Sequence, residues 1–180
     1  MKVLRWPILF ALIICAAGAA VWLYNNLLLQ RPLEQALSVD SRNVGVQVAV
    51  HFQHYTNPRV VVFDLRNVAG TNSRLDVFRI LLIFAKQEQS RQFDSVELDC
   101  RGRPRLWMRG DYFQELGREY ETANPIQTSL ALPAHVYDAN GRALYAPPDE
   151  GLYGLAAGLQ HFSAFMDRWC FRDLAMSFHN

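Results

Sequence analysis

Hydrophobic and polar positions follow three different patterns along the chain, and each pattern predicts a different element. Residues 6–24 are 19 consecutive residues without a charge. Residues 44–52 alternate between apolar and polar with a period of two, which is typical of a half-buried strand. Residues 152–169 place apolar side chains three and four positions apart, which indicates a helix with one apolar face. We therefore expect a membrane-sized helix followed by one α+β domain.

The uncharged segment 6–24 is long enough to cross a bilayer, because about 20 helical residues span the hydrocarbon core. Lys2 and Arg5 precede it, so the positive-inside rule places residues 1–5 in the cytoplasm and the rest of the chain outside. The sequence thus predicts a single-pass protein of the inner (plasma) membrane, attached to the membrane through residues 6–24, with an extracytoplasmic domain.

A cleaved signal peptide is the alternative interpretation of the same segment. Residues 17–19 (Ala-Gly-Ala) are an acceptable cleavage motif after a positively charged start and a short apolar run. Cleavage there would give a secreted or periplasmic protein. The apolar run continues past this motif to Trp22 and Tyr24, aromatic residues that suit the headgroup level of a bilayer. The uncleaved anchor is therefore the preferred interpretation.

The rest of the chain divides into a linker with a short helix (25–43) and one exported domain (44–180), which is large enough for a well-buried core. The elements expected in this domain are strands at 44–52 and 60–65, a helix at 73–89, strands at 96–100 and 105–109, a short helix from 111, a hairpin around 140–141 and a closing helix at 149–174. This order, ββαββα followed by a hairpin and a long C-terminal helix, predicts an α+β fold with helices on an antiparallel sheet.

The two strands on either side of residues 101–104 are expected to form a hairpin with a three-residue loop. That loop length places Leu98 opposite Met108 on the apolar face. It also places Glu97 opposite Arg109 on the polar face, where the opposite charges would attract each other.

Composition and motifs exclude several classes of protein but do not identify a function. A net charge of +1 in 180 residues, with 51% hydrophobic residues, argues against a disordered chain and against a nucleic-acid partner. The sequence contains no glycine-rich phosphate loop, no GxSxG, no HExxH and no CxxC. We therefore expect no catalytic residue, no metal ligand and no cofactor.

Two cysteines, Cys100 and Cys170, lie outside the membrane segment. In an oxidising compartment two such residues often form a disulfide, here across a long loop. Alternatively they are two small buried hydrophobic residues, since both occupy apolar faces of their expected elements. The sequence leaves both interpretations open, because it does not give the distance between them.

Four arginines and a tryptophan crowd the hairpin, namely Arg101, Arg103, Arg105, Trp107 and Arg109. They are a candidate site for an anionic partner such as a lipid headgroup, a glycan phosphate or an acidic protein patch. The alternative is that acidic residues of the preceding strand pair with them and leave little net field.

The expected helix 73–89 is apolar almost all round between residues 80 and 85. Such a helix is either buried or covered by another molecule, so Ile80, Ile83 and Phe84 form a candidate partner surface. We therefore expect a non-catalytic, membrane-anchored interaction module of the cell envelope, which binds an envelope protein or a second copy of itself. The alternatives are a domain that binds a small ligand or an anionic lipid or glycan, and an unrecognised hydrolase or thiol enzyme.

Overall fold

The computed structural model describes residues 5–147 and 151–176 and confirms the α+β class. Lys2 and Asp149, which enter the predictions of topology and of the closing helix, lie outside these residues. Five strands form one sheet in the order in which they occur along the chain. They are β1 (Val46–Gln53), β2 (Asn57–Val68), β3 (Ser95–Cys100), β4 (Arg103–Arg109) and β5 (Val136–Tyr137).

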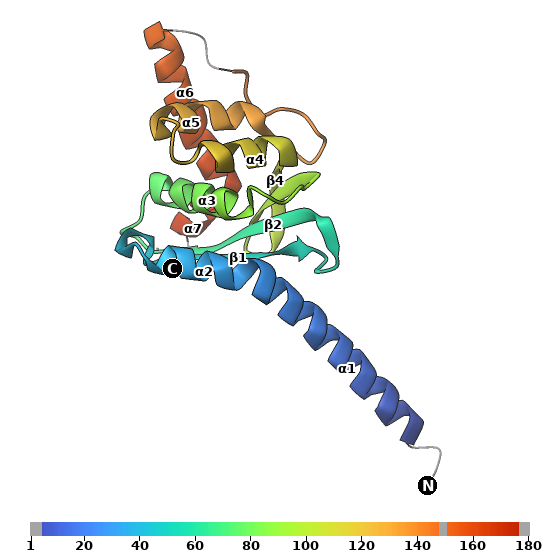
Figure 1. Cartoon of the computed structure of the whole chain (residues 1–180). Helices are drawn as coiled ribbons and strands as arrows, with labels where there is room; N and C mark the ends of the chain where they lie inside the picture. Colours follow the sequence, from blue (N-terminus) through green and yellow to red (C-terminus); the bar gives the residue numbers. More distant parts are fainter. Residues whose placement is uncertain (1–4, 148–150, 177–180) are drawn as a thin grey trace.

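The chain begins with one continuous helical rod, which Figure 1 shows projecting from the domain. The rod consists of α1 (Arg5–Asn25), a π-helical turn η1 (Asn26–Gln30) and α2 (Arg31–Ser38). Its part from Leu9 to Ser38 is, among the described residues, long and apolar enough to cross a membrane. A signal sequence satisfies the same criteria.

The remaining helices lie in the domain, and the longest of them are α3 and α6. In chain order the helices are η2 (Ser41–Asn43), α3 (Arg74–Glu88), α4 (Gly110–Glu119), α5 (Pro125–Ala131), η3 (Leu132–His135), α6 (Gly151–Met166), η4 (Asp167–Phe171) and α7 (Arg172–Met176). The hairpin expected around residues 140–141 is present in a short form: β5 pairs with the returning chain through an antiparallel bridge from Tyr137 to Ala143, and the N–H of Leu144 donates to the carbonyl of Val136 (3.0 Å).

The sheet is mixed, so the expectation of an antiparallel sheet is wrong at its centre. Strands β2 and β3 pair in parallel, while β1–β2, β3–β4 and β4–β5 pair antiparallel. The connection between β2 and β3 runs through α3, which returns the chain to the end of the sheet where β2 began. A strand that follows such a crossover runs parallel to the one before it.

The β3–β4 hairpin has a different register from the one expected. Its turn contains two residues, Arg101 and Gly102, which both have positive φ (52° and 75°), as short hairpin turns require. A three-residue loop was expected, so the predicted pairs are displaced and Glu97 does not lie opposite Arg109. The observed pairs are Ser95 with Arg109, Val96 with Met108, Glu97 with Trp107 and Leu98 with Leu106.

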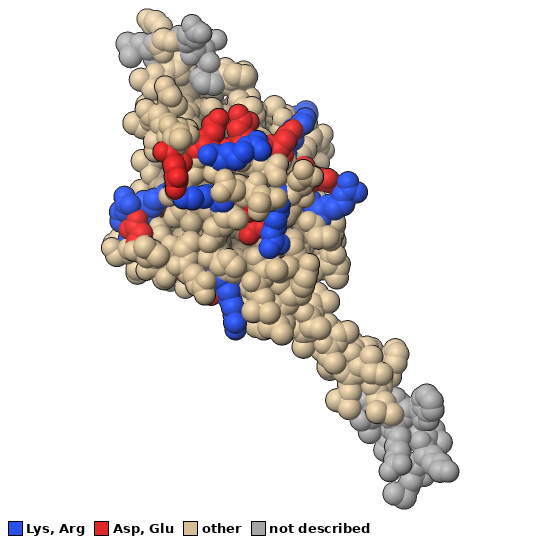
Figure 2. Space-filling model, viewed as in Figure 1, with Lys and Arg blue, Asp and Glu red and all other residues tan. Residues whose placement is uncertain are grey.

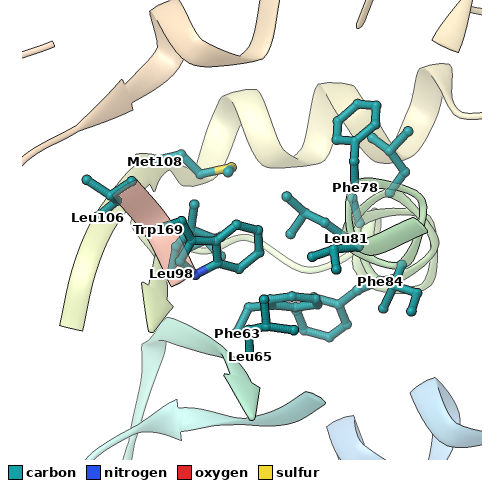
Figure 3. Packing of buried hydrophobic residues seen from close by; sticks show 14 of the residues in the cluster. Phe63, Leu65, Phe78, Leu81, Phe84, Leu98, Leu106, Met108 and Trp169 are labelled. Carbon is teal, nitrogen blue, oxygen red and sulfur yellow. The ribbon is translucent and has the colours of Figure 1, made fainter. Parts of the chain in front are cut away.

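The hydrophobic core fills the space between one face of the sheet and the helices above it. Figure 3 shows side chains from β2, β3 and β4 meeting those of α3 and η4 around Trp169, which is fully buried. Leu29 and Leu33, from the end of the N-terminal rod, are also buried in this core. The rod is therefore part of the domain and not a tether beside it.

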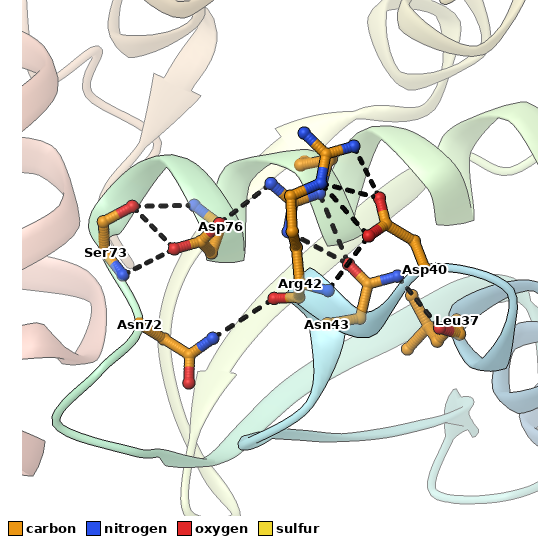
Figure 4. A network of polar contacts seen from close by, with 8 residues as sticks. Leu37, Asp40, Arg42, Asn43, Asn72, Ser73 and Asp76 are labelled. Atoms are coloured by element: carbon orange, nitrogen blue, oxygen red, sulfur yellow. Dashed lines mark hydrogen bonds and ion pairs between the residues drawn. The ribbon is translucent and has the colours of Figure 1, made fainter.

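Polar contacts fix the start of α3 to the segment that follows α2 (Figure 4). Ser73 and Asp76 form a reciprocal capping box, as the sequence pattern S-x-x-D indicates. Next to it, Asn72 Nδ2 donates to the carbonyl of Arg42 (3.3 Å), and Asn43 Nδ2 donates to the carbonyl of Leu37 (3.0 Å). These bonds hold the N-terminal rod in one orientation relative to α3.

Candidate functional site

The partner surface expected on α3 is not exposed. Ile80 and Phe84 are fully buried, and Ile83 is half-buried and packs against the core. The sequence pattern did not show whether other parts of the protein cover this helix. In the structure they do. Helices α2 and α4 pack against α3 on the sides that the sheet does not reach. Ile80, Ile83 and Phe84 are core residues.

Two of the three arginines of the β4 strand are neutralised within the chain, although not by the acidic residues of β3. Arg105 forms an ion pair with Asp173 of α7, and Arg109 forms one with Asp111 at the start of α4. Side-chain hydrogen bonds to Asp111 raise the pKa of the exposed Arg109. At Arg105 and Arg109 the hairpin therefore presents paired charges, which interrupt a continuous cationic surface.

The other residues of the arginine-rich hairpin are separated from one another. Arg101 and Arg103 are exposed at and next to the turn. Trp107 lies toward the opposite end of the strand, where its indole stacks on Tyr137 (4.7 Å between ring centroids) and donates to the carbonyl of Asp138 (2.9 Å). The aromatic ring thus joins β4 to β5 and is not arranged as a platform for a ligand.

Cys100 and Cys170 form a disulfide, with 5.3 Å between their Cα atoms. Cys100 ends β3 and Cys170 lies in η4, so the bond ties the closing helix to the sheet. Both residues are buried, and next to them the indole of Trp169 donates to the carbonyl of Asp99 (2.8 Å). In this oxidised form neither sulfur can act as a nucleophile.

Sequence reasoning missed a pair of buried carboxyl groups, Asp64 on β2 and Asp99 on β3, which lie side by side on the two parallel strands. Arg66 Nη2 lies 2.6 Å from Asp64 Oδ2, and the backbone N–H of Gly102 also donates to Asp64. Asp99 Oδ1 is buried without a hydrogen-bond partner. Burial, followed by the charges of Asp64 and Glu97, raises the pKa of Asp99 to about 7.

This pair can hold a proton near neutral pH, but it is not placed to act on a substrate. The side chain of Asp64 is fully buried, and Asp99 is only 6% exposed. A general acid must reach the proton it transfers within hydrogen-bond distance of the substrate. One signal for the pair was present in the sequence, namely a charged residue, Asp64, within a run that is apolar on both faces.

The largest exposed apolar side chains of the closing helix lie on α6. Its sixteen residues, Gly151–Met166, include no Asp, Glu, Lys or Arg. Tyr153 is 92% exposed, Leu159 52% and Leu155 42%. Leu155 and Leu159, which lie four positions apart on one side of the helix, are called the α6 surface below; Tyr153 lies on another side. Leu155 and Leu159 belong to the apolar face that the pattern of residues 152–169 predicts, and this part of the face is only partly covered.

Helix α6 is held from its other side by α5. Gly158 is buried there, and a Cβ atom at this position would lie 2.9 Å from Leu130 Cδ2. The close approach at Gly158 fixes which side of α6 faces the protein. In the view of Figure 2 the charged side chains lie across the middle of the molecule, and the described atoms at both projecting ends are uncharged. The α6 surface is the candidate partner site.

The part of the chain that the structure describes contains no group of three or more His, Cys, Asp or Glu side chains placed to hold a metal ion. The chain matches no family model, and no curated protein or solved structure is significantly similar to it.

Proposed function

We propose that the protein is a single-pass, membrane-anchored interaction module of the cell envelope, with no catalytic role, and that its partner binds the α6 surface. The observation that carries this proposal is the exposure of Leu155 and Leu159 on one side of a helix without charged residues. Both leucines are already about half covered, so each would gain on the order of 1 kcal/mol when a partner buries the rest, and an apolar partner would be bound favourably.

The N-terminal rod supports the anchoring part of the proposal. Residues 6–24 carry no charge, and the rod continues without interruption into buried Leu29 and Leu33. An anchor built in this way transmits the orientation of the membrane helix to the domain. With the N-terminus in the cytoplasm, the domain lies outside the inner membrane.

The arrangement of the two ends supports a role that connects the membrane with a partner. Figure 1 shows α1 and the start of α6 at opposite ends of the molecule. A partner on α6 would therefore be held away from the bilayer. The partner is an envelope protein with an apolar helix or groove, or a second copy of this chain, and the sizes of the crosslinked products distinguish the two.

The alternatives receive less support from the same residues. An anionic ligand would have to displace the ion pairs of Arg105 with Asp173 and of Arg109 with Asp111. A hydrolase would need an accessible acid or nucleophile, whereas Asp99 is buried and Cys170 is in a disulfide. An interaction module requires only the surface that α6 presents.

Site-specific photo-crosslinking in native membranes tests the proposal. A photoreactive residue at Leu159 should give one discrete product of higher mass, and a photoreactive residue at the exposed turn residue Arg142 should give none. A product of twice the monomer mass identifies a second copy, and any other mass identifies a different protein. The absence of a product at both Leu155 and Leu159 would contradict the proposed surface.

Substitution by aspartate supplies the matched control. Leu159→Asp should abolish the product formed from a photoreactive residue at Leu155, because the charge would be buried in the interface. Gln160→Asp adds the same charge at the neighbouring exposed position and should leave the product unchanged. Equal loss in both variants would indicate that the net charge of α6, and not its apolar side chains, controls the association.

A further inference from the structure

A cavity lies at the point where the N-terminal rod leaves the domain. It has a volume of about 400 Å³ and is lined on one side by Ala20, Val21 and Tyr24 of α1. The opposite side is formed by the β1–β2 hairpin, chiefly by Phe52, Tyr55 and Pro58. No lining residue carries a charge, so the cavity offers an apolar surface to its occupant.

Hydrogen bonds hold the hairpin against the rod and fix the shape of this cavity. Asn25 is 2% exposed; its Oδ1 accepts from the backbone N–H of Phe52 (2.7 Å), and its Nδ2 donates to the carbonyl of Tyr55 (2.8 Å). The rings of Tyr24 and Phe52 lie 5.9 Å apart. The turn residue Tyr55 has a positive φ of 63°, and its ring stacks on that of His51 (4.3 Å between ring centroids).

The position of the cavity along the rod indicates its environment. Tyr24 ends the uncharged segment 6–24, and Ala20 and Val21 lie one turn earlier. In a chain anchored by this segment, these residues lie where the acyl chains of the outer leaflet meet the headgroups, the level at which tyrosine and tryptophan gather. Trp22 is 58% exposed and Tyr55 is 42% exposed at the same level of the molecule.

We propose that this cavity binds an acyl chain of a phospholipid in the outer leaflet, and that the tip of the β1–β2 hairpin rests in the membrane interface. The inference rests on the proposed anchoring by α1. The cavity continues the apolar surface of the membrane segment, and this continuity favours lipid over a soluble ligand. Lipid bound between rod and hairpin would stabilise the angle at which the domain stands on the membrane.

Fluorescence quenching by brominated lipids tests the inference. The full chain carrying Trp6→Phe and Trp22→Phe is reconstituted into phosphatidylcholine vesicles whose acyl chains are brominated near the headgroup. Tyr55→Trp is then compared with Tyr153→Trp, which places a tryptophan at an exposed tyrosine on the distal α6. The tryptophan at position 55 should lose most of its emission, because bromine quenches only tryptophans that lie close to it and these bromine atoms are near the interface. Trp107 and Trp169 should keep their emission, so the total from the three tryptophans should fall by about a third.

Three outcomes decide between the possibilities. Quenching of Tyr55→Trp, with Tyr153→Trp unaffected, supports a hairpin and cavity in contact with lipid. Equal, unquenched emission in a chain that resists extraction by alkaline carbonate overturns the lipid site but leaves the anchor intact. A chain that carbonate releases from the vesicles overturns the proposed anchoring and the lipid site together.

Discussion

The side-chain amide of Gln30 is hydrogen-bonded to the backbone of Val50, with Gln30 Oε1 2.8 Å from the Val50 nitrogen. The Nε2 atom of the same amide donates to the carbonyl of Val48 (3.1 Å). Val48 and Val50 are two residues apart on the outer edge of β1, so the amide occupies the place of a peptide unit from a neighbouring strand. One turn earlier on the rod, Asn25 binds Phe52 in the same way. The rod thus protects an edge strand that would otherwise be open to pairing.

Gln30→Ala is expected to lower the free energy of unfolding by about 1–3 kcal/mol, because a donor and an acceptor of β1 lose their partner. Thermal unfolding of the detergent-solubilised full chain, followed by near-ultraviolet circular dichroism, measures the change. Gln35→Ala, on an exposed position of α2, is the control and should alter the unfolding temperature little. Equal effects of the two substitutions would contradict a role for Gln30 in closing the edge.

The disulfide between Cys100 and Cys170 is expected to survive purification without reductant. Thiol labelling of the denatured, unreduced chain should modify one cysteine, Cys15, which is free and exposed on α1. Labelling after reduction should modify three. Because the bond closes a loop with a sequence separation of 70, its reduction should cost about 4 kcal/mol of stability in the chain-entropy description. Three labelled thiols before reduction would contradict the bond.

Stability is expected to fall as the pH rises from about 4 to 7, because of Asp99. Its pKa is about 7 in the folded protein, against a usual value of 3.8, so the folded state retains a proton that the unfolded state releases in this range. Asp99→Asn removes this dependence and should raise the free energy of unfolding at pH 8 by on the order of 1–3 kcal/mol.

Urea unfolding of the solubilised chain at pH 4.5 and pH 8, which lie on either side of the pKa of Asp99 in the folded protein, measures the effect of Asp99→Asn. The control is Asp94→Asn, whose side chain is largely exposed and pairs with Arg59. This variant should keep the pH dependence of the unsubstituted protein. An unchanged pH dependence in Asp99→Asn would show that Asp99 does not hold the proton.

Ile83→Asp is expected to unfold or strongly destabilise the domain, because Ile83 packs against the core and an unpaired carboxylate would be forced into it. Leu75→Asp introduces the same change in the first turn of the same helix, where the side chain is 58% exposed, and should be tolerated. The far-ultraviolet circular dichroism of the two variants compares them. A folded Ile83→Asp variant would restore the interpretation of α3 as a partner surface.

Local patterns determined much of the fold. The period of two marked β1, and the capping box of Ser73 and Asp76 marked the start of α3. The run Val60–Leu65 was expected to be buried on both faces; its residues from Val61 to Leu65 are buried, and Val60 is half-buried. These features depend on neighbours a few positions apart, so the sequence alone contains the information. The uncharged run 6–24 likewise sets the length and polarity of α1.

The tertiary structure decided which surfaces are covered and which strands are neighbours. Apolar periodicity is similar in α3 and α6, yet Phe84 is buried under other helices and Leu159 is exposed, because only packing determines whether a second element lies over an apolar face. The parallel pairing that brings Asp64 next to Asp99 depends on where the α3 crossover returns the chain. The hydrophobic effect makes the burial of an apolar side chain favourable, and this can be read from the sequence. Whether another element covers that side chain depends on parts of the chain that are distant in sequence.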